Sequence, residues 1–104
     1  MSRPDLLICA DWFAPGYRAG GPIRSVVNLT QLLASSCEVR VLTSCCDLGE
    51  SRPYDGISVN QWLPWSDGTQ VFYGQAGARR REFSRLLSRQ RPHAVYLNSM
   101  FSWS

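Results

Sequence analysis

Short apolar blocks alternate along the chain with polar stretches that are rich in glycine and proline. Residues 6–10 are continuously apolar, which is typical of a strand buried on both faces of a parallel sheet. Over residues 22–35 the apolar positions recur every three or four residues behind Pro22, and this spacing predicts a helix that packs on the sheet. Residues 38–43 alternate polar and apolar side chains and predict a second strand. Together they predict a right-handed βαβ unit.

The second half of the chain continues the alternation less regularly. After a polar loop over residues 47–56, the pattern predicts a third strand over residues 57–62. Residues 71–73 predict a small added strand or a hairpin arm. Residues 77–91 predict a surface helix that ends at Pro92, with arginines on one face and apolar residues on the other, namely Phe83, Leu86 and Leu87. Residues 94–97 predict a last buried strand.

Alternating strands and helices predict an open α/β sheet that is mainly parallel, within one domain or part of one. Ligands of such sheets bind beyond the carboxyl ends of the strands, where the strand order reverses. The segments to inspect for a site are therefore residues 11–21, 43–46 and 98–103.

Composition removes several classes of protein. The longest apolar stretch has far fewer than the roughly 18 residues of a membrane-spanning helix, and Asp5 and Asp11 flank it, which disfavours a secretory signal. The default expectation is a cytoplasmic protein. Cys45 and Cys46 are adjacent and His93 is the one histidine, so the spacing favours no zinc site and the thiols are expected to be structural.

The net charge is +3, and all eleven basic residues are arginines. Six of them follow residue 78, which raises a nucleic-acid hypothesis for Arg79, Arg80, Arg81, Arg85, Arg89 and Arg91. A solvated helix face is the favoured interpretation, because only one helix is basic and no exposed aromatic series accompanies it. We therefore expect no nucleic-acid partner.

Residues 11–21 predict a glycine-rich loop that leads into a helix N-terminus, where free N–H groups and the helix dipole favour a phosphate. The spacing of Gly16, Gly20 and Gly21 does not fit the G-x-G-x-x-G dinucleotide fingerprint. A P-loop needs lysine after its last glycine, whereas Gly21 is followed by Pro22. Neither an NAD-binding fold nor a P-loop NTPase is supported.

The segments 12–15 and 19–26 resemble the start of family 4 glycosyltransferases of the GT-B fold, with an aromatic-x-Pro loop and a Gly-Gly turn into the first helix. Residues 38–43 are similar to the second strand of that family, and residues 91–99 to a later strand and the residues after it. The three motifs stand in the family's order and span nearly the whole chain. The resemblance implies that residues 1–104 are a partial, truncated N-terminal, acceptor-side Rossmann-like domain, without the donor domain.

The resemblance also implies a function. Relatives transfer a sugar, with retention of configuration, from a nucleotide-diphosphate sugar to an acceptor sugar or lipid-linked glycan, usually without a metal or a separate cofactor. It places Gly20, Gly21 and Arg24 at the donor diphosphate and sugar, and Asn98 and Ser99 on the acceptor side. Polysaccharide or glycoconjugate synthesis is the implied setting, and peripheral membrane association of the full-length protein stays open.

The chain departs from the family at its histidine. Many relatives have one on or just beyond the strand at residues 96–98, whereas His93 precedes that strand, so His93 is not expected to be catalytic and no catalytic residue is assigned. The chain alone is expected to be inactive. The alternative hypothesis is a stand-alone α/β module that binds a phosphorylated or sugar ligand without catalysis.

Overall fold

The computed structural model describes residues 3–16, 20–46, 49, 51–65 and 68–97. The described residues form strands and helices in this order: β1 (Asp5–Cys9), α1 (Gly21–Leu33), β2 (Glu38–Ser44), β3 (Trp62–Pro64), β4 (Gln70–Gly74), α2 (Ala76–Arg85), the π-helical turn η1 (Leu86–Gln90) and β5 (Ala94–Leu97). Four predicted elements are confirmed with small shifts of their ends: the first two strands, the first helix and the last strand.

The strands form one five-stranded sheet in the order β3-β4-β2-β1-β5. β1 pairs in parallel with both β2 and β5, β2 pairs in parallel with β4, and β3 alone runs antiparallel, against β4. The expected α/β fold with a mainly parallel sheet is confirmed. The chain leaves β1 toward β2 on one side and later returns to the other side of β1 as β5, so the strand order reverses between β1 and β5.

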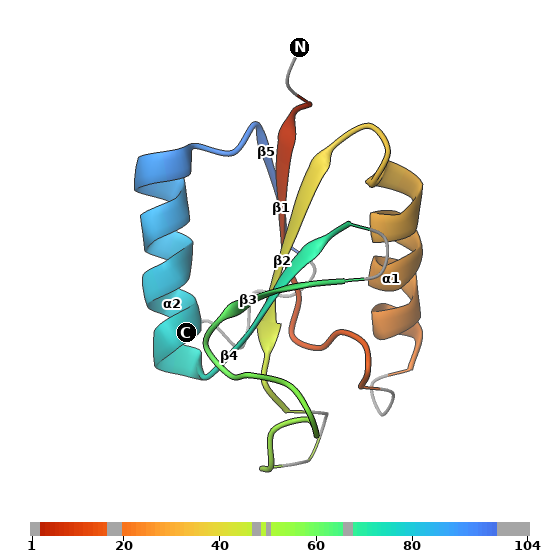
Figure 1. The fold of residues 1–104 in the computed structure, drawn as a ribbon, viewed down its shortest axis with the longest axis vertical. Helices are drawn as coiled ribbons and strands as arrows, with labels where there is room; N and C mark the ends of the chain where they lie inside the picture. The colour runs from red at the N-terminus through yellow and green to blue at the C-terminus, as the bar shows by residue number, and fades with distance from the viewer. Residues whose placement is uncertain (1–2, 17–19, 47–48, 50, 66–67, 98–104) are drawn as a thin grey trace.

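The two helices cover opposite faces of the sheet (Figure 1). α1 follows β1 and runs back against the strand direction, so its N-terminus lies at the edge where the parallel strands end. This arrangement brings the glycine loop, the end of β2 and the end of β4 to one edge, which we call the carboxyl edge.

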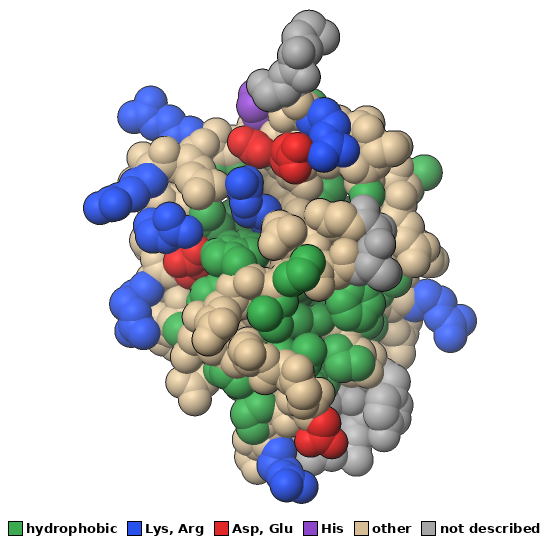
Figure 2. All heavy atoms as spheres, in the orientation of Figure 1, with side chains coloured by type: hydrophobic (Ala, Val, Ile, Leu, Met, Phe, Trp, Pro, Cys, Tyr) green, Lys and Arg blue, Asp and Glu red, His purple; other side chains and the backbone are tan. Residues whose placement is uncertain are grey.

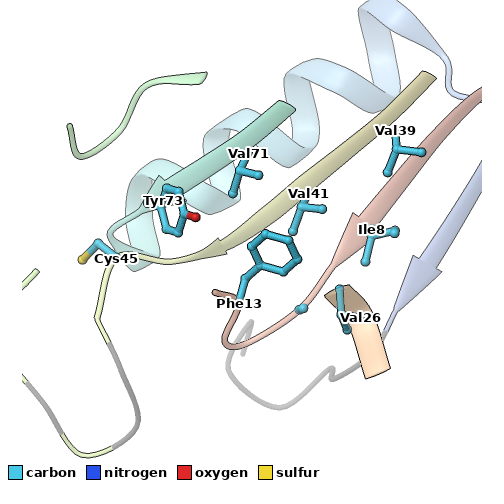
Figure 3. Close-up of a cluster of buried hydrophobic side chains, with 9 residues drawn as sticks. Ile8, Phe13, Val26, Val39, Val41, Cys45, Val71 and Tyr73 are labelled. Carbon is cyan, nitrogen blue, oxygen red and sulfur yellow. The ribbon is translucent and has the colours of Figure 1, made fainter. Parts of the chain in front are cut away.

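The main core fills the space between the sheet and α1. Figure 3 shows the ring of Phe13, from the loop after β1, beside Val41 of β2. Val26 of α1 and Tyr73 of β4 belong to the same buried cluster. A second cluster on the α2 side joins Leu7 and Leu42 of the sheet to other apolar residues, including Phe72 and Leu86.

The predicted strand over residues 57–62 is wrong. This segment forms a turn in which Asn60 has a φ of 63°, and its N–H donates to the Tyr73 carbonyl at 2.8 Å. Ile57 and Val59 are half-buried and pack on the core from this turn. Ile57 and Val59 alternate with exposed residues, as the residues of a half-buried strand do, but they belong to a turn.

The strand over residues 71–73 is larger than predicted. β4 is an interior strand with β2 on one side and β3 on the other, so the hairpin-arm alternative describes only its pairing with β3. Its last four residues are buried. Trp62 of β3 packs on Phe72 at a ring-centroid distance of 5.4 Å, and Trp65 packs on Phe13 at the same distance, so both tryptophans act in packing.

Burial departs from prediction at three places. β5 pairs only with β1, and Val95, Tyr96 and Leu97 are 36–47% exposed, so the expectation of a buried last strand is wrong. Leu32 and Leu87 lie on the outer sides of their helices and are 74% and 41% exposed.

The helix predicted over residues 77–91 consists of two parts. Its α-helical part, α2, ends at Arg85, and the π-helical turn η1 follows directly. At the end of η1, Arg91 donates its N–H to the Leu86 carbonyl.

Candidate functional site

The loop after β1 is held in place by the core before it reaches the glycines. Phe13 is fully buried, and the Gly16 N–H donates to its carbonyl at 2.9 Å. The Tyr73 hydroxyl donates to the Ala14 carbonyl at 2.5 Å, and the Tyr54 hydroxyl donates to the Phe13 carbonyl at 3.4 Å. Burial raises the pKa of Tyr73, which keeps its hydroxyl protonated as a donor. These bonds attach the first part of the loop, up to Gly16, to the core.

Gly20 is the residue that turns the chain into α1. It is the N-cap with a φ of 69°, a conformation that L side chains rarely adopt, and glycine relieves that strain. Its carbonyl accepts the N–H groups of Ile23 and Arg24 at 3.1 and 3.3 Å. Because Pro22 has no N–H, the backbone donors left at this helix start are those of Gly20 and Gly21.

The two glycines leave backbone donors without a described partner. Among the described residues, neither the Gly20 nor the Gly21 N–H has a hydrogen-bond acceptor, and a Cβ added at either glycine would meet nothing within 4 Å. The first turn of α1 holds no acidic residue that would occupy the positive end of the helix dipole. The position therefore suits an external anion.

A pocket of about 480 Å³ lies against these residues. Its lining brings together all three residues predicted for the donor site, Gly20, Gly21 and Arg24, with Gly16, Ile23 and Val27. Arg24 is exposed, so its guanidinium is accessible to a ligand. The pocket combines an apolar wall from α1 with two amides and one fixed positive charge.

The residues predicted for the acceptor side, Asn98 and Ser99, lie outside the described residues. β5 does bring Leu97 beside Cys9 of β1, which directs the chain toward the carboxyl edge next to the strand-order reversal. The second predicted segment, residues 43–46, also lies at this edge, where the Ser44 N–H donates to the Asp11 carbonyl at 3.2 Å.

Sequence reasoning missed a group of buried and half-buried residues at the carboxyl edge. It consists of Asp11, Cys45, Cys46 and Arg79, and we call it the closed cluster. Arg79 belongs to the predicted basic surface but is only 7% exposed. Its stem lies over Gly74, where an added Cβ would come within 2.9 Å of the Arg79 Cγ. Burial lowers the pKa of the Arg79 guanidinium, and the charges of Asp11, Cys45 and Cys46 act in the opposite direction. Arg79, Phe83 and Leu86 recur at helical spacing and so share one face of the helix. This spacing was the available sequence signal that Arg79 faces the core.

The other arginines on this helix lie at the surface. Arg80, Arg81, Arg85 and Arg89 are exposed, and Figure 2 shows arginine side chains along the side of the molecule where α2 lies. Arg85 forms an ion pair with Glu82, whose carboxylate also accepts the Trp62 indole N–H at 2.5 Å. The hydrogen bond from Arg85 contributes most to lowering the pKa of Glu82. One of these exposed arginines, Arg85, is therefore paired within its own helix.

His93 is exposed, and its Nδ1 accepts the Asp5 N–H at 3.0 Å near the opposite edge of the sheet. Within the described ranges, no three acidic, histidine or cysteine side chains lie close enough to hold a metal ion. In that part of the chain there is also no helix with the length and apolar character needed to cross a membrane.

Comparisons of this chain with protein-family models, with curated proteins and with solved structures found no match.

Proposed function

We propose that this chain is the front part of the acceptor-side domain of a retaining glycosyltransferase that uses a nucleotide-diphosphate sugar. The observation that supports the proposal is the pocket at the start of α1, where Gly20, Gly21 and Arg24 meet around open space. The motif resemblance implies the same three residues for the donor site. A cytoplasmic location for the parent protein is part of the same proposal.

The role of each group follows from charge. In sugar transfer an acceptor hydroxyl bonds to the anomeric carbon, the bond to the diphosphate breaks, and negative charge grows on the departing diphosphate. The two glycine N–H groups are donors for its oxygens, and the Arg24 guanidinium offsets its charge. The absence of a Cβ at Gly20 and Gly21 lets the ligand approach the backbone closely.

We also propose that this part alone is insufficient for activity. The pocket volume of about 480 Å³ falls within the ordinary range for small-molecule sites. Two amides and one guanidinium suit a diphosphate, but they offer nothing that would distinguish one nucleotide base from another. We therefore assign base recognition to a second Rossmann-like domain of the parent protein, with Asn98 and Ser99 toward the acceptor.

The test begins with the coding DNA downstream of Ser104, which should continue in frame into a second Rossmann-like half. Calorimetric titration of that full-length product with UDP, GDP and ADP sugars should then reveal one preferred donor. Arg24→Gln should weaken its Kd by about tenfold, the scale of one hydrogen bond to a charged group. The matched control is Arg81→Gln, an exposed arginine on the other helix, which should leave Kd unchanged.

Two outcomes would overturn the proposal. One is a full-length product that binds none of these donors, and the other is equal donor affinity in the Arg24→Gln and Arg81→Gln variants. A stop codon at the end of the chain, with ligand binding but no turnover, would instead identify a binding module.

A further inference from the structure

Cys45 and Cys46 place two thiols in contact at the end of β2. Their Sγ atoms are 3.4 Å apart, and no disulfide joins any of the four cysteines, each of which lies within the described residues. Cys9 is buried in the sheet, where burial raises its pKa to about 12. Cys37 is half-buried beyond the other end of β2. The adjacent pair is thus the chemically distinctive one.

The two thiols differ in access. Cys45 is 7% exposed, its N–H donates to the Gly74 carbonyl at 3.2 Å, and its carbonyl accepts the Tyr54 N–H at 3.0 Å. Figure 3 shows its sulfur pointing away from the other labelled core side chains. Cys46 is half-buried. Of the two residues, Cys46 is therefore the more exposed to a reagent from solvent.

A basic side chain lies at the same place. The stem of Arg79 lies over Gly74, whose carbonyl accepts the Cys45 N–H at 3.2 Å, and the charges of Cys45 and Cys46 act on the pKa of the Arg79 guanidinium. Among the described residues, this is the place where two thiols and a buried guanidinium come together.

We propose that Cys45 and Cys46 form a vicinal dithiol that a small-molecule disulfide, such as oxidised glutathione, reversibly converts to an intramolecular disulfide. The Cys46 thiolate attacks the small disulfide, forms a mixed disulfide and releases one small thiolate. The Cys45 thiolate then attacks the Cys46 sulfur and releases the second. The protein loses two electrons and two protons, and the reagent leaves as two thiols.

Ring closure has a local consequence. A disulfide bond is about 2.05 Å long, so the sulfurs must approach by roughly 1.4 Å. The ring that closes contains the peptide group between the two cysteines, and this peptide must rotate. Its carbonyl accepts the Tyr54 N–H, so oxidation should weaken that hydrogen bond and speed amide exchange at Tyr54.

The test exposes the full chain to glutathione buffers of increasing oxidising strength, followed by alkylation and peptide mass spectrometry. Free thiols should fall from four to two per chain, with the loss of two hydrogens on the fragment that holds Cys45 and Cys46. Dithiothreitol should restore all four. In Cys45→Ser, glutathione should stay attached to Cys46, because the resolving thiol is gone. Cys37→Ser is the matched control and should oxidise like the wild type.

Persistent glutathione on Cys46 in the wild type would overturn the proposal, because it would show that Cys45 does not resolve the mixed disulfide. Equal rates of disulfide formation in the native and guanidinium-unfolded chains would also overturn it, since the fold would then contribute nothing. If Cys45→Ser does not fold, Cys46→Ser provides the second arm. Its shielded Cys45 should stay unmodified over the time in which the wild type oxidises, and equally fast modification would contradict the assignment.

Discussion

Two parts of the carboxyl edge use the same residue types in opposite ways. At the start of α1, a Cβ on Gly20 or Gly21 would meet nothing within 4 Å, and Arg24 is exposed. At the end of β4, a Cβ on Gly74 would lie 2.5 Å from a Phe72 ring carbon, and Arg79 is buried above it. The glycine and arginine of the first part leave room for a ligand, whereas those of the second make the packing possible.

The comparison shows what glycine contributes at each place. Gly74 is glycine because its neighbours occupy the space of a side chain, so its role is complete without a ligand. Gly20 is glycine because its φ of 69° requires it, while Gly21 has ordinary helical geometry and free space. Among the described residues, no atom lies within 4 Å of a Cβ built at Gly21, so packing against them does not require glycine there, and the proposed function assigns this position to close approach of the ligand. Substitutions at these positions should therefore differ in both size and kind.

The largest effect is expected for Gly74→Ala. The added methyl group overlaps the Phe72 ring and the Arg79 stem, both of which are buried, so relief requires movement of the core. Overpacking of this kind should lower the free energy of unfolding by about 3 kcal/mol, measured by urea denaturation. A loss below about 1 kcal/mol would show that Phe72 can turn aside without cost, and the contrast between the two parts would weaken.

Gly20→Ala should come second. Alanine in this backbone conformation should cost about 2 kcal/mol of stability through strain, with no steric overlap. Urea denaturation measures the loss. A variant as stable as the wild type would mean that the turn into α1 relaxes to a negative φ, and the position of the Gly21 donor would then no longer be fixed by this turn.

The sequence predicted the first half of the fold well because local signals there agree with the tertiary structure. A continuous apolar run, a helical period and a short alternating strand each correspond to an element that is buried as its pattern requires. The predicted third strand is misplaced because Ile57 and Val59 are half-buried in a turn, whereas β4 has only three strongly β-prone residues. Pairing with a strand on each side fixes β4, and no local pattern encodes that.

The candidate site divides in the same way. Gly20, Gly21 and Arg24 are neighbours in the chain, so their spacing alone indicated a common location. The closed cluster joins Asp11, residues 45–46 and Arg79, which are separated by more than 30 residues. The bond from Tyr73 to Ala14 spans 59 residues. Such contacts depend on strand order, and only the helical spacing of Arg79 with Phe83 and Leu86 gave a local hint.

Tyr73→Phe tests the connection between the two parts. The hydroxyl on β4 holds the loop that leads to Gly20, and its loss removes one buried hydrogen bond and leaves the Ala14 carbonyl without that donor. We expect a loss of about 1.5 kcal/mol in urea denaturation. Tyr54→Phe is the matched control and should cost less, because that side chain is half-buried and its bond is 3.4 Å long. Equal losses would contradict a special role for Tyr73.

The smallest stability effect, and the most informative about function, is expected for Gly21→Ala. Alanine fits the first helical position, where its Cβ meets no atom within 4 Å, and it reduces the freedom of the unfolded chain. Stability should therefore rise by about 0.5 to 1 kcal/mol in urea denaturation. Binding of the preferred nucleotide sugar by the full-length product should nevertheless fall, because the new methyl group projects into the pocket beside the donor N–H.

Gly77→Ala separates these two effects. Gly77 lies in the first turn of α2, where an added Cβ makes only an ordinary 3.5 Å contact with Arg81, so this variant should gain similar stability without touching the pocket. If Gly77→Ala keeps its affinity for the nucleotide sugar and Gly21→Ala loses it, glycine at position 21 contributes to ligand binding and lowers the stability of the fold. Unchanged donor affinity in Gly21→Ala would leave the open part of the edge without a function, because its one unexplained glycine would then be dispensable.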